Sequence, residues 1–288
     1  MSDVYTQSVE LHRKNQGKLG VAPRVEVRDK TELSLVYTPG VAEVCRTIVE
    51  DRNESFALTW RGRAVAVVSD GSAVLGLGNI GAEAAMPVME GKALLFKQVG
   101  GGEAIPLCID LHTTDQIVDF VKAIAPSFAG INLEDIAAPI CFEVEDKLQD
   151  LGIPVMHDDQ HGTAIVVSAA LMNAAKVVGK RYEDLRVVIS GAGAAGLAVA
   201  QMLLAHEREH ARLVEVEGRR VKEVIILDSK GVINTASGGL KAEFAKITNQ
   251  SGQSGGLKEA IVGADAFIGV SKGGIMTSEM VLMMAKDA

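Results

Sequence analysis

The sequence has few cysteines, no long apolar run and no leader-like N-terminus. Its three cysteines cannot all pair, and none belongs to a Cys-x-x-Cys motif, so we expect a reducing compartment and no structural zinc. No segment approaches the ~18 apolar residues of a membrane helix. Residues 1–18 are polar and lack the apolar core of a signal peptide. We therefore expect a cytoplasmic protein without a membrane partner.

An excess of positive charge is also absent. The chain carries 29 Lys and Arg against 37 Asp and Glu, a net charge of −8, and its pI is about 5.3. An acidic chain is a poor match for nucleic acid or an anionic membrane. Hydrophobic residues make up 48% of the 288 residues, which is ample for a buried core. The length predicts about two domains.

Short apolar runs alternate with helical segments along the whole chain. This alternation is typical of α/β layers built on parallel strands. We expect two α/β domains, residues 1–160 and residues 161–288, with three strands in the second. The predicted strands are residues 64–68, 105–109, 129–132, 187–189, 224–227 and 266–270.

Two acids and two histidines precede a helix predicted at residues 163–178. Asp158 and Asp159 are adjacent, and His157 and His161 flank them. Helix capping explains one such carboxylate, whereas two carboxylates also suit a hard divalent cation. Both interpretations stay open for this stretch. The histidine spacing occurs at zinc sites, but no third soft ligand is evident.

A second pair of acids, Glu134 and Asp135, follows the predicted strand at 129–132. Neighbouring side chains within a strand point to opposite faces, so both acids can bind one ion only where the strand ends. Together with Asp159 they would form an oxygen-rich site for Mg²⁺ or Mn²⁺. The alternative is that they are solvated surface carboxylates.

The pattern Gly-x-Gly-x-x-Gly occurs twice, and its second copy has the context of a dinucleotide site. The strand predicted at 187–189 leads directly into Gly191, and a helix follows Gly196. Such glycines permit a tight turn that presents backbone N–H groups to a pyrophosphate at a helix N-terminus. We predict NAD or NADP binding here. The candidate contacts are Gly191, Gly193, Ala194, Ala195 and Gly196.

Asp228 ends the next predicted strand, where a carboxylate can accept a hydrogen bond from a ribose hydroxyl. Its distance from the glycines exceeds the usual spacing of roughly 20 residues, which the charged segment 206–223 explains. We interpret that segment as a solvated face or connecting loop. Asp228 would repel a 2′-phosphate, which slightly favours NAD, although Lys230 could pair with that phosphate instead.

The first glycine copy lacks this context, because Gly71 already breaks the strand before Gly76. One interpretation is a close-packed glycine turn at Gly76, Gly78 and Gly81. The other is a loop that lines the cleft between the domains. We favour the cleft and assign no pyrophosphate to it.

Two further residues, Lys92 and Tyr37, could each have a catalytic or only a structural role. Lys92 lies in an apolar segment, where a lysine either extends its amine to solvent or is desolvated and serves as a base. Tyr37 lies in a turn, where a tyrosine is more often a packing residue than a proton donor.

In their order along the chain, these stretches resemble the malic enzymes, in particular the short bacterial form. The resemblance covers most of residues 37–231. Its motifs are Tyr37-Thr38-Pro39-Gly40-Val41, Leu75-Gly76-Leu77-Gly78-Asn79, Glu90-Gly91-Lys92, Leu133-Glu134-Asp135-Ile136, Asp158-Asp159-Gln160-His161-Gly162-Thr163, the 191–196 fingerprint and Asp228-Ser229-Lys230-Gly231.

The resemblance implies oxidative decarboxylation of malate to pyruvate and CO₂ with reduction of NAD or NADP. It implies that Lys92 is the general base, that Tyr37 protonates the enol carbon, and that Glu134, Asp135 and Asp159 hold Mg²⁺ or Mn²⁺. The chain would then act on a small molecule, as a homodimer or higher homo-oligomer. Residues 1–160 would be the catalytic and metal-binding domain, and residues 161–288 a Rossmann-like NAD(P)-binding domain.

Two alternatives stay open. Malolactic chemistry would convert malate to lactate with the same motifs. A non-catalytic, ligand-binding remnant is the other, because members of the family continue after the last helix with another strand. We therefore expect an incomplete nucleotide domain that binds the adenosine half of the dinucleotide, turns over poorly, and aggregates unless a partner subunit covers it.

Overall fold

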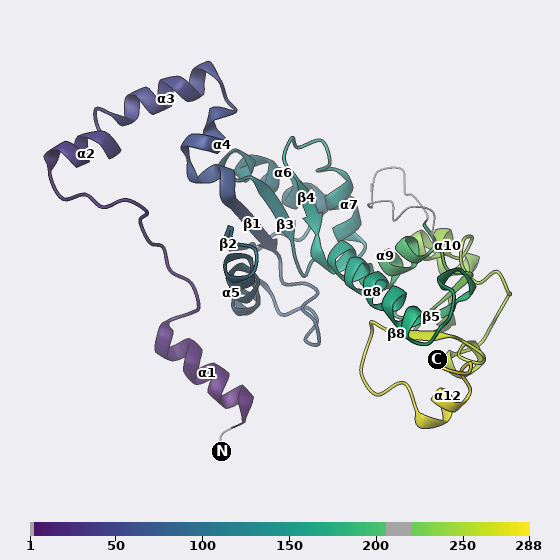
Figure 1. The fold of residues 1–288 in the computed structure, drawn as a ribbon. Helices are drawn as coiled ribbons and strands as arrows, with labels where there is room; N and C mark the ends of the chain where they lie inside the picture. Colours follow the sequence, from purple (N-terminus) through teal and green to yellow (C-terminus); the bar gives the residue numbers. More distant parts are fainter. Residues whose placement is uncertain (1–2, 206–219) are drawn as a thin grey trace. The chain divides into compact units, whose positions relative to one another are not determined.

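The computed structural model describes residues 3–205 and 220–288, which divide into two compact units (Figure 1). The first unit comprises Met1–Ile136 and Lys147–Met156, and the second comprises Ala137–Asp146 and His157–Ala288. The chain passes into the second unit near the predicted boundary after residue 160. The segment 137–146, which we expected in the first domain, belongs to the second unit.

The first unit contains a sheet with the strand order β2-β1-β3-β4. β1 runs parallel to both of its neighbours, and its nearly complete burial explains why the sequence shows one continuous apolar run. All three strands predicted in this part of the chain are present, with ends shifted by one or two residues. The strands are β1 (Ala64–Ser69), β2 (Glu103–Cys108), β3 (Gly130–Leu133) and β4 (Val155–His157).

Helix α5 (Ala82–Gln98) packs beside β1 and β2 and carries Lys92. Its buried Met89 and Ala93 contact Val67 of β1. The helices α1, α2 and α3 bury none of their side chains. The remaining helices of this unit are α1 (Val4–Asn15), α2 (Lys30–Val36), α3 (Val41–Glu50), α4 (Glu54–Leu58) and α6 (Thr114–Ile124), with short 3₁₀ turns at Trp60–Arg63 and Ala125–Ser127.

The second unit contains a sheet with the order β7-β6-β5-β8. β5 pairs in parallel with β6 and β8, which confirms the α/β class. The expected count of three strands is one too low, because β7 also pairs with β6, antiparallel; two residues are too few for a periodic signal. The strands are β5 (Arg186–Ser190), β6 (Glu223–Asp228), β7 (Gly231–Val232) and β8 (Ala266–Gly269).

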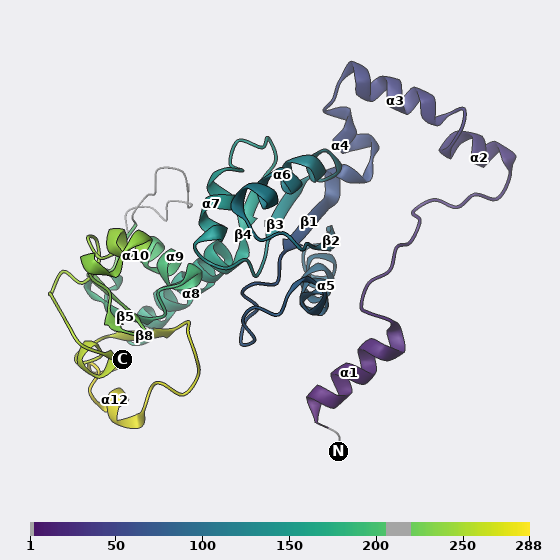
Figure 2. The same cartoon turned by 180° about the vertical axis from the view of Figure 1, so that it is seen from behind.

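The helices α8 and α9 of the second unit lie side by side in both views (Figure 1 and Figure 2). Buried Val188 of β5 and Ile225 of β6 pack with Ile261, and methionines from the C-terminal segment border this cluster. The helices are α7 (Ile140–Asp146), α8 (Asp158–Val177), α9 (Ala194–Leu203), α10 (Gly239–Phe244), α11 (Leu257–Ala260) and α12 (Ser278–Leu282), with 3₁₀ turns at Tyr182–Asp184 and Thr235–Ser237.

Helix α8 begins at Asp158, five positions before the predicted start at residue 163. The prediction was wrong because Gly162 reads as a helix breaker. In the structure Gly162 is helical, and the carboxylate of Asp158 lies where a Cβ on Gly162 would stand. The two acids therefore occupy the first turn of the helix, where negative charge is favourable.

The charged segment 206–223 lies mostly outside the described residues, since 206–219 are not among them. Glu223, the last residue of the segment, contradicts the interpretation as a solvated face or loop. Glu223 is buried in β6, and its Oε2 lies 3.1 Å from Nε of Arg186. Among the helices of the described residues, none is long and apolar enough to cross a membrane.

Candidate active site

The predicted acids Glu134 and Asp135 lie just past the carboxyl end of β3, which stops at Leu133. Both residues are buried, 6% and 4% exposed, so the surface interpretation is wrong. Asp135 has a φ of +53°, a left-handed conformation that Asp tolerates better than most residues. The strand has ended before both acids, as a shared cation would require.

Lys92 reaches one of these acids. Its Nζ lies 3.0 Å from Oε1 of Glu134, and the lysine side chain is only 25% exposed. The amine therefore meets a buried carboxylate, which contradicts the solvent-directed interpretation. This ion pair joins two residues that the sequence predicted to serve the same site.

Asn132 is a further candidate site residue, which the sequence analysis missed. Its Nδ2 donates to Oε2 of Glu134 over 2.7 Å. Its own Oδ1 is buried and has no hydrogen-bond partner in the described structure. An unsatisfied oxygen on a residue that is bonded to the buried Glu134 carboxylate suits a hard cation or a water bound to it. Strand alternation could have indicated the residue, because positions 132 and 134 are two apart.

Tyr37 does not join this group. It ends helix α2 and is 67% exposed. Its backbone N–H donates to the Leu33 carbonyl over 2.9 Å, and its own carbonyl accepts from the Val41 N–H over 2.8 Å. Among the described residues, the structure records no contact between Tyr37 and Lys92.

In the second unit, the start of α8 is organised by Glu145 of α7, which the sequence analysis also missed. Glu145 is 4% exposed. Its Oε1 accepts from the His157 backbone N–H over 2.9 Å and lies 2.7 Å from Nε2 of His161. Its Oε2 accepts from Nε2 of Gln160 over 3.2 Å. No sequence signal marks Glu145, because a single acid in a helix has no periodic or motif character.

Asp159 stands within this turn and is about one third exposed. Its Oδ2 lies 3.4 Å from Nε2 of His157, whose ring is fully buried. Burial lowers the pKa of His157, against the opposing effect of the Asp159 and Glu145 charges. The N-cap is His157, whose side chain makes no capping hydrogen bond. Asp158 and Asp159 are the first residues of the helix and not its N-cap, so the favourable effect of their charge on the first turn and the cation interpretation both stay open.

The three predicted metal ligands come from both units. Glu134 and Asp135 belong to the first unit, and Asp159 belongs to the second. In residues 3–205 and 220–288, no group of three or more His, Cys, Asp or Glu side chains forms a ready metal site. The combined site stays a prediction.

The second glycine fingerprint has the geometry that a dinucleotide requires. Gly191, at a φ of +127°, directly follows β5, and a Cβ on Gly196 would collide with the Gly191 carbonyl. A Cβ on Gly193 would instead meet no atom within 4 Å. Close packing thus explains the outer glycines, whereas Gly193 faces open space where a pyrophosphate can approach. Ala194 and Ala195 begin α9 without a side-chain cap, so their N–H groups can face an anion.

Asp228 ends β6 as predicted, but it is already paired. Nζ of Lys241 lies 2.7 Å from its Oδ2, and the Lys230 backbone N–H donates to its Oδ1 over 2.8 Å. The hydrogen bond from Lys241 lowers the pKa of Asp228. Lys230 itself is exposed. The sequence analysis missed Lys241, which is 13 positions away.

The first glycine copy forms an open turn. Gly76, Gly78 and Gly81 have φ values of +76° to +78°, and a Cβ on any of them would meet no atom within 4 Å. The close-packed interpretation is therefore wrong; left-handed backbone conformation explains these glycines. The cleft interpretation stays a prediction.

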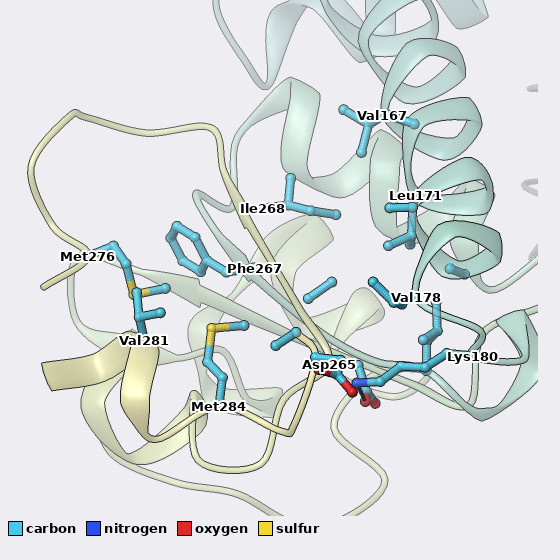
Figure 3. Close-up of a pocket in the computed structure, with 17 residues that line it drawn as sticks. Val167, Leu171, Val178, Lys180, Asp265, Phe267, Ile268, Met276, Val281 and Met284 are labelled. Carbon is cyan, nitrogen blue, oxygen red and sulfur yellow. Dashed lines mark hydrogen bonds and ion pairs between the residues drawn. The ribbon is translucent and has the colours of Figure 1, made fainter. Parts of the chain in front are cut away.

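An apolar pocket of about 570 Å³ lies between α8, β8 and the C-terminal segment (Figure 3). Phe267, Met276 and Met284 line it, and the ion pair of Lys180 and Asp265, 2.7 Å apart, stands at one edge. None of the predicted site residues lines this pocket.

Comparison with known proteins identifies the family. The family described as malic enzyme, N-terminal domain, matches residues 16–116 and 111–149. The family described as malic enzyme, NAD binding domain, matches residues 160–288. These matches cover well over half of the chain.

Proteins with similar sequences and structures are named as malic enzymes. A bifunctional malic/malolactic enzyme of Bacillus subtilis (strain 168) is 50% identical over 98% of this chain and 67% of its own length. An NAD-dependent malic enzyme of Geobacillus stearothermophilus is 50% identical over 94% of this chain, which spans 55% of that protein. The crystal structure of an NAD-dependent malic enzyme from Thermotoga maritima has a TM-score of 0.89 at 45% identity, covering 99% of this chain and 73% of that one. Two family matches, half-identical relatives and a shared fold show that the chain belongs to the malic enzyme family.

Proposed function

We propose that the protein oxidises and decarboxylates malate, producing pyruvate, CO₂ and NADH or NADPH from malate and the oxidised dinucleotide. The ion pair between Lys92 and Glu134 carries this proposal, because it joins a candidate base to a candidate metal ligand in a buried place. The glycine turn after β5 supplies the second requirement, an opening for the dinucleotide at Gly193.

Lys92 is the general base in this scheme. Its Nζ takes the proton from the C2 hydroxyl of malate as the C2 hydride leaves for the dinucleotide. For that step the amine must be neutral, and a divalent cation held by Glu134 would offset the attraction between that carboxylate and a charged amine. Asn132 holds the Glu134 side chain from the other side, so that the carboxylate beside the base keeps its orientation.

Glu134, Asp135 and Asp159 would hold Mg²⁺ or Mn²⁺. The buried, unsatisfied Oδ1 of Asn132 supports this, together with the burial of the first two carboxylates. When bound, the ion would supply Lewis-acid stabilisation of negative charge on the substrate oxygens. Hard oxygen donors match these two ions better than zinc.

Tyr37 completes the scheme as the acid that protonates carbon C3 of the enol after CO₂ has left. Its exposed position on α2 supports access to a ligand. For the nucleotide we keep a slight preference for NAD, which rests on Asp228; the pairing of Asp228 with Lys241 leaves room for NADP.

One experiment separates this function from two others. The protein is incubated with malate, Mn²⁺ and NAD⁺ or NADP⁺, while absorbance at 340 nm and lactate are measured. Net reduction supports the proposal. Lactate without accumulating NADH would support malolactic chemistry, the second candidate, which is favoured by the relative named as a bifunctional malic/malolactic enzyme. Neither product would indicate a non-catalytic protein.

We also propose that the protein is a homodimer or a higher homo-oligomer. The helices α1 to α3 bury none of their side chains. Their large apolar residues Tyr5, Leu35 and Val49 are 69–83% exposed to solvent. Large apolar side chains exposed on helices that bury none of their residues support an interaction with another chain. Sedimentation equilibrium tests the proposal, and a monomer at micromolar concentration would contradict it. The cytoplasm is the proposed location, since three unpaired cysteines suit a reducing compartment.

A further inference from the structure

The carboxylate of Glu145 is a buried charged group of the second unit that no sequence motif predicts. It comes from α7, is 4% exposed, and directs both oxygens at the start of α8. A buried carboxylate is strongly unfavourable unless hydrogen bonds compensate for its lost hydration. Three hydrogen bonds of Glu145 have partners within five consecutive residues, 157 to 161.

These three partners define the first turn of α8. The first N–H groups of a helix have no partners within the helix, and the N-cap side chain of His157 provides none. Glu145 takes over this role from a neighbouring element, because it accepts from the His157 backbone N–H. It also holds the side chains of Gln160 and His161, one turn along.

Asp159 lies between the anchored positions. His157 on one side and Gln160 on the other are both hydrogen-bonded to Glu145. Glu145 thus holds the backbone at the beginning of this turn and two of its side chains. The direction of the Asp159 carboxylate therefore depends on Glu145. The fully buried ring of His157, 3.4 Å from Oδ2 of Asp159, further limits the rotation of that carboxylate.

We propose that Glu145 is a positioning residue for the divalent-cation site and acts through Asp159. This inference rests on the proposed function, in which Asp159 binds Mg²⁺ or Mn²⁺. Glu145 does not touch the ion in this account; it holds the turn that presents Asp159. Residues that orient metal ligands commonly change metal affinity by about 10- to 100-fold when they are replaced.

The test is Mn²⁺ titration of the purified protein by calorimetry and by the EPR signal of unbound Mn²⁺. Glu145→Leu removes both acceptor oxygens and with them the three hydrogen bonds, and we expect its Kd for Mn²⁺ to rise at least about tenfold. Glu145→Gln keeps one oxygen for the His157 N–H and can pair with a flipped Gln160 amide, so we expect rescue to within about threefold of the wild type. Binding of NAD⁺ or NADP⁺, measured on the same samples, should be unchanged.

Glu223→Gln is the matched control. Glu223 is also a buried glutamate of the second unit, 8% exposed. Its partners Arg186 and Ser251 both lie outside α8. We expect its Mn²⁺ affinity to equal that of the wild type. An equal loss of affinity in Glu223→Gln would mean general loosening of the unit and would overturn the proposal.

Other outcomes are equally decisive. Wild-type affinity in Glu145→Leu would overturn the role of Glu145 and leave the metal site standing. A wild-type protein that binds no Mn²⁺ would remove the metal site itself. If Glu145→Leu does not fold, the double variant Gln160→Ala, His161→Ala removes two anchored side chains and leaves Glu145 in place. Unchanged Mn²⁺ binding in that variant would also overturn the proposal.

Discussion

Lys241 pairs with Asp228 at the end of β6, with 2.7 Å between Nζ and Oδ2. The carboxylate that the sequence assigns to a ribose hydroxyl is thus neutralised by a lysine from α10. A positive charge at this place would tolerate a 2′-phosphate, which a lone carboxylate would repel. We therefore predict that the choice between NAD and NADP depends on both residues.

The first prediction concerns this pair. Lys241→Met leaves the charge of Asp228 uncompensated, so we expect kcat/KM for NADP⁺ to fall roughly tenfold relative to NAD⁺, the effect of one charge-assisted hydrogen bond. Asp228→Asn should shift the ratio the other way. Steady-state assays with both nucleotides measure it. Lys230→Met is the control; a larger change there than in Lys241→Met would identify Lys230 as the phosphate contact.

The second prediction concerns the base. Lys92→Ala should lower kcat by about 10²–10⁴ because proton removal from the malate hydroxyl is lost, while dinucleotide and metal binding are largely retained. Lys97→Ala is a matched control on the same helix, since Lys97 pairs with Glu103 of β2. Near-normal turnover in Lys92→Ala, measured at 340 nm, would show that Lys92 is not the general base.

The third prediction separates the two halves of the reaction. Tyr37→Phe should keep reduction of oxaloacetate and lose pyruvate formation, because only the second process needs a proton at carbon. Tyr37 is 67% exposed, so the substitution should change the free energy of unfolding by no more than about 0.5 kcal/mol. Equal loss of both activities would argue against a proton donor.

The fourth prediction concerns the ion. Asp159→Asn should weaken Mn²⁺ binding, because an amide is a poorer ligand for a hard cation than a carboxylate. Isothermal titration of wild-type and variant protein gives the two Kd values. If they agree, Asp159 is not a ligand, and Asp158→Asn becomes the next variant to measure.

The fifth prediction concerns thiol reactivity. Burial raises the pKa of Cys141 to about 12, so its thiolate is negligible at pH 8, where the thiolate is the reactive form. Cys45 is exposed and should react quickly with Ellman's reagent. We expect Cys141 to react only after denaturation. Rapid labelling of Cys141 in the native protein, located by peptide mass spectrometry, would contradict its burial.

Local patterns determined much of this protein. The alternation of apolar runs and helices predicted six of the eight strands in the described residues, because a buried parallel strand needs an uninterrupted apolar run. The short strands β4 and β7 were missed. The glycines at 191 and 196 were predictable because their roles are steric and lie within one turn. The positions of Glu134 and Asp135 after β3 followed from the end of that strand. The order of the motifs along the chain then indicated the family.

Tertiary structure decided which charged groups are paired. Glu145 reaches residues 12 to 16 positions away, and Lys241 reaches Asp228 over 13 positions. No period or motif predicts such pairs, because each depends on how separate elements pack. The start of α8 was misread for the same reason: Gly162 breaks a helix by propensity, whereas the Asp158 carboxylate packed against it makes a glycine fit there. Propensity is a property of the residue, and burial and pairing are properties of the folded chain.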